Sequence, residues 1–374
     1  MENAASFIWR DNYLIAANHA SPGKLFGEKG LRALCYSTLS GKTGEEANLT
    51  GFTGAELLLH YQAEKLKIYE TRNALDSDSG NEKSTSQDYS GRLFLELLQN
   101  AVDAMSDRPI GHKGLGFRVT TKFAESIRVH SGDLHFEFSR EQARELVKNH
   151  TGGKIDDASM HILSVPASFD LSSEEPFIRD LIDIQKFDTV VVLKIKREDE
   201  AVMNALEQQW SEITCNPSTM LFLQSIGQIT WVRETTTTTW DRHRHPNDSH
   251  RVELVVDGDP FEDWMVRGDA EKALIAARYE SEALVPLPPS YQDSNQVRTY
   301  FRTDEVNPVP AFVLHLNLPL ERNREHFTKE AVESSSEALE AAASLLLIFS
   351  PSFQIVAWPW IFFAGRKALV QAPG

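Results

Sequence analysis

The stretch from Glu96 to Phe117 constrains the fold of this chain most, because it joins an amphipathic helix pattern to a glycine-rich loop. In ELLQNAVDAMSDRPIGHKGLGF, Glu96, Asn100 and Asp103 lie at i, i+4 and i+7, which stacks two carboxylates and an amide on one helix face. Apolar residues at helical spacing form a second face: Phe94, Leu98, Val102 and Met105. The pattern predicts a helix with its apolar side in a core and its polar stripe in a cleft.

A loop with three glycines and one lysine follows this helix. Its candidate ligand-binding residues are Gly111, Lys113, Gly114, Leu115, Gly116 and Phe117. A glycine has no Cβ, so backbone N–H groups can turn toward an anion, and the lysine adds a positive charge. The loop is therefore predicted to bind phosphate groups.

Together, the two motifs resemble those of a known superfamily. The run from Glu96 to Ala104 is similar to the N-box of the GHKL ATPases, which include gyrase B, the ninety-kilodalton heat-shock chaperone, sensor histidine kinases and MutL. The run Gly111-His-Lys-Gly-Leu-Gly-Phe117 resembles the second glycine box of the sacsin-like branch. The helix pattern alone is a weak signal, whereas the two motifs in succession are fairly specific.

This resemblance implies both a fold and a set of roles. The expected fold class is α+β, with a Bergerat-type α/β sandwich, a mixed sheet covered by helices, followed by a second α/β domain. Glu96 would be the general base that polarises the attacking water, and Asn100 would ligate the Mg²⁺ that bridges the phosphates of ATP. Asp103 and the glycine loop would contact the nucleotide. Phosphoryl transfer suits this set, since it needs positioning and charge neutralisation rather than a covalent nucleophile.

One part of the superfamily pattern is absent from the sequence. Its members place a strand and an Asp-x-Gly-x-Gly turn between the two boxes, where the aspartate binds the adenine amino group. Only residues 106–110 separate the helix from Gly111 here, too few for a strand, a turn and a lid. Either the site is degenerate, or a segment of the native protein is missing from the chain. A non-catalytic scaffold with the same fold is therefore the alternative function, and a small-molecule kinase is a weaker one.

A second stretch resembles the heat-shock chaperone. Leu318-Pro-Leu320 and Arg324-Glu325 are similar to the middle-domain loop that lends an arginine to the γ-phosphate. The resemblance implies that Arg324 contacts the transferring phosphate; the alternative is a surface ion pair with Glu321 or Glu325.

Composition limits the class of protein. The formal charge of −16 argues against a sequence-independent nucleic-acid binder, because phosphate neutralisation needs clustered Lys and Arg. Cys35 and Cys215 have no metal-ligand spacing and form no disulfide framework, so a reducing cytoplasm is expected. The N-terminal residues show no signal-peptide pattern.

The sequence also predicts how the chain is organised. We expect an N-terminal, partly helical extension at residues 1–75, a nucleotide-binding domain at 76–215 and a middle, transducer-like domain at 216–374 with a C-terminal helix. The apolar segment 348–364 is interrupted by prolines and polar residues, which favours a buried or docking segment over a membrane span. The chain would be part of a larger protein with further C-terminal domains.

Local patterns predict the remaining elements. We expect helices at 54–75, 139–149, 197–213, 269–284 and 328–347, strands at 127–131, 134–138, 189–196, 220–223 and 226–232, and a polar linker at 76–88. The histidine-containing segment 241–250 is expected to be a solvated hairpin tip rather than a metal site, and Asp257-Gly258 a hairpin turn.

The functional expectation is an ATP-driven clamp. A homodimer would bind ATP and Mg²⁺, and its closure would act on a protein client, as in chaperones, or on a DNA-associated partner, as in repair and anti-phage defence systems built on this module.

Overall fold

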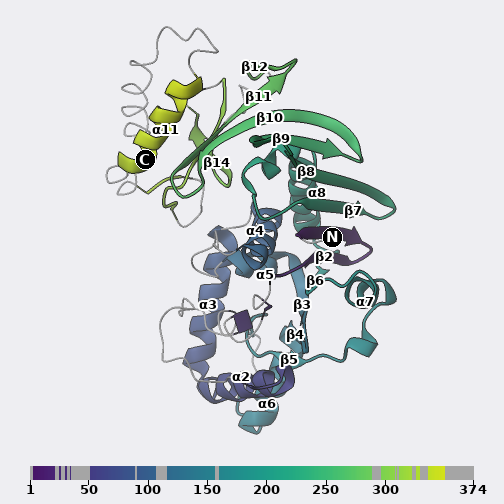
Figure 1. Cartoon of the computed structure of the whole chain (residues 1–374). Helices are drawn as coiled ribbons and strands as arrows, with labels where there is room; N and C mark the ends of the chain where they lie inside the picture. Colours follow the sequence, from purple (N-terminus) through teal and green to yellow (C-terminus); the bar gives the residue numbers. More distant parts are fainter. Residues whose placement is uncertain are drawn as a thin grey trace. The chain divides into compact units, whose positions relative to one another are not determined.

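The computed structural model describes residues 3–21, 25–26, 30–31, 34, 51–88, 91–106, 116–155, 160–288, 296–307, 309, 311–321, 326–328 and 336–349. These residues form a mixed α/β protein whose strands pair in both parallel and antiparallel directions (Figure 1). The chain divides into two compact units. Unit 1 comprises Met1–Cys215 and Gln228–Thr238, and unit 2 comprises Asn216–Gly227 and Thr239–Gly374.

Unit 1 is built on a sheet with the strand order β7-β1-β2-β6-β3-β4-β5. Its strands are β1 (Ala4–Arg10), β2 (Tyr13–Asn18), β3 (Ala124–Ser131), β4 (Leu134–Ser139), β5 (Ala167–Ser168), β6 (Thr189–Ile195) and β7 (Gln228–Arg233). Its helices are α2 (Gly54–Ile68), α3 (Arg72–Asp88), α4 (Leu93–Met105), α5 (Thr120–Phe123), α6 (Arg140–Thr151), α7 (Pro176–Asp183) and α8 (Glu200–Thr214), with 3-10 turns η1 (Gly116–Val119) and η2 (Leu171–Ser173). The β1–β7 pair is parallel and the other pairs are antiparallel.

Both faces of the sheet in unit 1 are covered. On one face, α7 inserts Ile178 and Leu181 among side chains of β1, β2 and β6, including Ile15 and Val192. On the other side, α4 packs against β2 and α5 packs against β3 and β6 (Figure 1). Because a β-strand alternates its side chains between two faces, strands covered on both sides have apolar residues at consecutive positions, as in β6.

Several local predictions for unit 1 are confirmed. Strands β3 and β4 form the expected hairpin around Gly132, whose φ of 58° lies in the left-handed region that a tight turn needs. Helix α6 begins after Ser139, whose hydroxyl oxygen accepts a hydrogen bond from the N–H of Gln142 at 3.1 Å, and ends at Gly152 with a φ of 63°. Residues Thr151–Lys154 thus form the C-terminal glycine turn of α6.

The strands of unit 2 are ordered β14-β13-β15-β11-β10-β9-β8, with β12 beside β11, in the same hydrogen-bonded strand order that continues from β8 to β7. Its elements are η3 (Pro217–Phe222), β8 (Thr236–His245), β9 (Asp248–Val256), β10 (Asp259–Asp269), β11 (Ala273–Glu280), β12 (Ala283–Val285), β13 (Gln296–Thr299), β14 (Phe301–Val306), β15 (Val313–Leu316) and α11 (Ser336–Phe349). Asp257 and Gly258 have φ values of 52° and 86°, which confirms the predicted hairpin turn. Helix α11 packs on β10, β11 and β15 and places Ala338 and Ala342 in the core.

Three sequence-based predictions are wrong. Residues 76–88, expected as a linker, belong to α3. Residues 269–284, expected as a helix, contain β11 and β12, because the run Ala273–Ala277 is buried on both strand faces and so lacks the alternation that marks a strand. Residues 220–223, expected as a strand, lie in and directly after η3.

The expected separation of residues 1–75 from 76–215 is not found. Strand β2 pairs with β6 along its whole length, and α2 packs against β4, so both segments build unit 1. The first segment of unit 1 ends at Cys215, next to the expected domain boundary, but Gln228–Thr238 also belongs to unit 1. Among the described residues, every helix is too short or too polar to cross a bilayer.

Candidate functional site

Helix α4 carries the candidate residues Glu96, Asn100 and Asp103 and is held at both ends by hydrogen bonds to distant segments. At its start the N–H of Leu93 donates to Oε1 of Gln209 at 2.8 Å. At its end the N–H of Ser21 donates to the carbonyl oxygen of Ala104 at 2.9 Å, and its hydroxyl donates to that of Met105 at 3.0 Å. These bonds satisfy backbone groups that a helix leaves unpaired at its ends. They fix the position of α4 in unit 1.

The apolar side of α4 lies in the core, as predicted. Phe94, Leu98, Val102 and Met105 are all buried. The Phe94 ring packs edge-on against Trp210 of α8, with 5.4 Å between centroids.

The polar stripe of α4 differs in exposure along its length. Glu96 is only 3% exposed, Asp103 is half-buried and Asn100 is exposed. The exposed amide of Asn100 offers an oxygen of the kind that Mg²⁺ prefers, whereas the carboxylate of Glu96 is shielded from water.

The described end of the glycine loop lies beside this helix. Gly116 and Phe117 belong to η1, which packs against α4 and α3. Phe117 is buried, and its carbonyl oxygen accepts the hydroxyl of Thr120 at 2.6 Å. Buried Arg118 donates to the carbonyl oxygen of Leu34 at 3.2 Å. The C-terminal end of the loop is therefore fixed in the core, and Phe117 packs there.

Other predicted site residues lie outside the described residues. These are Gly111, Lys113, Gly114 and Leu115 of the loop, and Arg324 of the second motif. Of the predicted set, the described structure therefore contains Glu96, Asn100 and Asp103 on α4 and Gly116 and Phe117 on η1, two elements that pack against each other.

A buried polar cluster beside α3 was not expected from the sequence. Lys65 of α2 is 1% exposed, and its ammonium group lies 2.9 Å from Oδ2 of Asp78 in α3. The Tyr69 hydroxyl donates to the same carboxylate oxygen at 2.8 Å. Nε2 of His161 lies 3.1 Å from the same tyrosine oxygen, which accepts the imidazole N–H when the hydroxyl proton is donated to Asp78. Burial, followed by the nearby charge of Lys65, lowers the pKa of His161 to about 3, so this imidazole is neutral at pH 7.

One feature of the sequence could have revealed this cluster. Lys65 lies on the same helical face as Leu58 and Tyr61, and a lysine on an apolar face needs a buried acidic partner. The sequence does not indicate that Asp78 is that partner.

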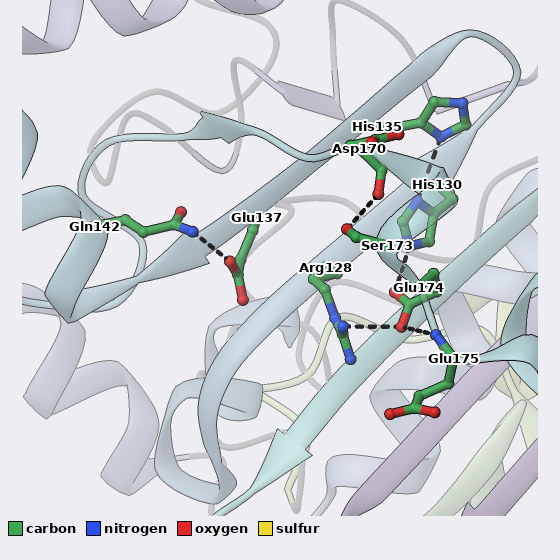
Figure 2. A network of polar contacts seen from close by, with 9 residues as sticks. All are labelled: Arg128, His130, His135, Glu137, Gln142, Asp170, Ser173, Glu174 and Glu175. Carbon is green, nitrogen blue, oxygen red and sulfur yellow. Dashed lines mark hydrogen bonds and ion pairs between the residues drawn. The ribbon is translucent and has the colours of Figure 1, made fainter.

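A second polar cluster joins the β3–β4 hairpin to the segment before α7 (Figure 2). The buried carboxylate of Glu174 accepts from Nη1 of Arg128 at 2.8 Å and from Nε2 of His130 at 3.2 Å. Burial raises the pKa of Glu174, but these two partners outweigh burial and the net pKa is lowered. Nδ1 of His130 lies 3.3 Å from Nδ1 of half-buried His135. Both carboxylate oxygens have partners within the chain, so this cluster fastens the segment before α7 to the sheet.

No group of three or more His, Cys, Asp or Glu side chains within the described residues is arranged to bind a metal ion. A Mg²⁺ held by Asn100, phosphate oxygens and water would not require such a group, because Mg²⁺ commonly uses one or two protein ligands plus substrate phosphates.

Comparison of the chain with protein-family models and with curated proteins finds no match.

Proposed function

We propose that unit 1 is a Mg²⁺-dependent ATP-binding and ATP-hydrolysing module of the GHKL type, with a Bergerat-type fold. One observation carries this proposal: Gly116 and Phe117, the described end of the glycine loop, lie in η1, which packs against α4, the helix that bears Glu96, Asn100 and Asp103. Phosphate-binding backbone and magnesium-binding oxygens would thus meet at one place.

Each candidate residue would have a separate role in ATP binding and hydrolysis. Asn100, exposed on α4, would ligate Mg²⁺, and the loop with Lys113 would bind the phosphates. Glu96 would accept the proton of the water that attacks the γ-phosphorus as the bond to the leaving ADP oxygen breaks. Arg324 would stabilise the charge on the transferring phosphoryl group.

At the level of the whole protein, we propose an ATP-driven clamp. Closure of a homodimer in the cytoplasm would act on a protein client or a DNA-associated partner.

The test is ATP binding and turnover with Mg²⁺ for the native chain and two single variants. We expect Asn100→Ala to weaken binding by about ten- to a hundredfold, because a charged hydrogen bond or ligand contact contributes ~1.5–3 kcal/mol. Glu96→Ala should still bind ATP and lose ~10²–10⁴-fold in turnover, the range for a general base.

Helix α6 offers a matched control. Glu145 and Asn149 have the same residue types and the same i, i+4 spacing on an exposed face of unit 1. Glu145→Ala and Asn149→Ala should change neither binding nor turnover. Unchanged turnover in Glu96→Ala and unchanged binding in Asn100→Ala would refute the assigned roles.

The burial of Glu96 favours a second candidate function, a scaffold that keeps the fold without turning over nucleotide. A carboxylate that is 3% exposed is a poor partner for water unless the site opens. Calorimetry separates the two candidates, since a folded native chain that releases no heat with millimolar ATP would favour the scaffold.

A further inference from the structure

Arg242 of β8 in unit 2 is a buried arginine without an acidic partner in the part of the chain that the structure describes. It is 9% exposed and lies opposite Leu254 of β9. Arg244, two residues along the same strand, lies opposite Val252 and is exposed. Because strand side chains alternate, both arginines lie on one face of the β8–β9 hairpin, with Cα atoms about 7 Å apart.

No group within the described residues neutralises Arg242. Its backbone N–H donates to the carbonyl oxygen of Gly227 at 2.8 Å, but the guanidinium Nε is buried without a hydrogen-bond partner. Burial, and then the charge of Arg244, lowers the pKa of Arg242 to about 10. Among the described residues, the charge that shifts the pKa of Arg242 is therefore that of another cation, Arg244.

Other arginines of the same sheet, unlike Arg242, have acidic partners. Arg251 of β9 is hydrogen-bonded to Asp263, and Arg278 of β11 lies 2.7 Å from Glu280. Acidic residues are abundant, with 54 Asp and Glu against 38 Lys and Arg. A buried unpaired charge is costly, so an arginine left without a carboxylate among the described residues, in so acidic a chain, points to a bound anion as its partner.

We propose that Arg242 and Arg244 bind an oxyanion of the phosphate class, either inorganic phosphate or a phosphomonoester. The guanidinium group is a planar fork that matches a phosphate, and its bonds are strongest where water is excluded, as around Arg242. Exposed Arg244 gives the anion an open approach and a second donor. A dianion between them would replace repulsion between two cations with two attractive contacts. The site is independent of the proposed ATPase.

The experiment measures the binding of inorganic phosphate and of glycerol phosphate to the full chain. Calorimetry gives the affinity, and thermal unfolding gives the stabilisation relative to chloride at equal ionic strength. We expect phosphate to raise Tm, since a ligand that binds only the folded state stabilises it. Tighter binding of glycerol phosphate would identify a phosphomonoester as the ligand, and equal or weaker binding would identify the free anion.

Two variants test the role of Arg242. Arg242→Met keeps the length of the side chain, and we expect phosphate affinity to fall about ten- to a hundredfold, the loss for a charged hydrogen bond. Its Tm without phosphate should equal or exceed that of the native chain, because a buried unpaired charge has been removed. Arg242→Lys keeps the charge without the fork and should bind with intermediate affinity.

Arg251→Met on the adjacent strand is the matched control. It removes an arginine that is already paired, so phosphate affinity should not change, whatever its effect on Tm. The proposal is overturned if phosphate stabilises the native chain no more than chloride does, or if Arg242→Met retains the native affinity.

Discussion

Helices α3 and α4 follow one another in the chain, yet unlike contacts hold them in unit 1. Helix α4 buries an apolar face that includes Leu98 and Val102. Helix α3 instead buries polar groups. Asp78 binds Lys65 and Tyr69, and the carboxylate of Glu82 accepts the N–H groups of Ile162 and Leu163 at 3.1 and 3.0 Å.

This difference distinguishes polar side chains that stabilise the fold from a polar side chain that is exposed and can bind a ligand. The carboxylates of Asp78 and Glu82 are occupied by partners in the fold, and each partner depends on that carboxylate. Asn100 of α4 is exposed, and the helix keeps its place through apolar packing and hydrogen bonds at its ends. A polar residue on α4 can therefore serve a ligand, whereas those buried on α3 serve the fold.

The largest effect on stability is expected at the polar contacts of α3. Lys65→Ala leaves the carboxylate of Asp78 without its ion-pair partner in a largely buried place, which should lower the free energy of unfolding by about 3–5 kcal/mol. Urea denaturation measures this change. Lys67→Ala, an exposed lysine of the same helix, should cost less than ~0.5 kcal/mol. Equal losses in the two variants would show that α3 does not depend on the buried pair.

A slightly smaller effect is expected at the apolar face of α4. Leu98 is fully buried, so Leu98→Ala removes apolar contacts and leaves a cavity, at a cost of about 2–5 kcal/mol in unfolding free energy. Urea denaturation again gives the value. A loss below ~1 kcal/mol would mean that α4 is held by its end contacts alone.

Lowering the pH should reduce the free energy of unfolding through His161, a member of the polar cluster beside α3. The pKa of His161 is about 3 in the folded chain, below the ~6.5 of an unfolded histidine. As pH falls below about 6.5 the unfolded chain takes up the proton first, so stability is lost between about pH 6.5 and pH 3. The contribution of His161 is about 2 kcal/mol of lost unfolding free energy from pH 7 to pH 5.

The variant His161→Phe isolates this contribution. Its loss of stability between the two pH values, measured by urea denaturation, should be about 2 kcal/mol smaller than that of the native chain. His315 in unit 2, whose pKa burial lowers to about 4, contributes in the same direction in both proteins and so cancels. An unchanged loss in the variant would contradict a neutral His161 in the folded state.

The contrast between the apolar packing of α4 and the polar contacts of α3 also explains which parts of the fold the sequence could predict. The apolar repeat of α4, the turn at Gly132 and the cap at Ser139 are local signals, and each was interpreted correctly. Helix α3 has no comparable apolar repeat, and the partners of Glu82 lie 80 and 81 residues away in the chain. A pattern within a short window cannot reveal such a partner.

For the candidate site, too, the sequence predicted the local spacing of the residues but not their packing. The spacing of Glu96, Asn100 and Asp103 on one helix was predicted because it follows from helical periodicity alone. The different burial of these three residues was not predicted, since it depends on packing around α4. Arg242 was likewise assigned to a solvated hairpin tip, because the sequence shows its charge but not its burial.

The smallest effect on stability is expected at Asn100. Its substitution should change ATP affinity without changing the free energy of unfolding. Its side chain is exposed, so Asn100→Ala should change the free energy of unfolding by less than ~0.5 kcal/mol while ATP affinity falls about ten- to a hundredfold. Urea denaturation and calorimetry on the same sample measure both. A loss of several kcal/mol would place Asn100 among the structural polar residues, like those of α3, and would remove the distinction between the two helices on which its role as a magnesium ligand is proposed.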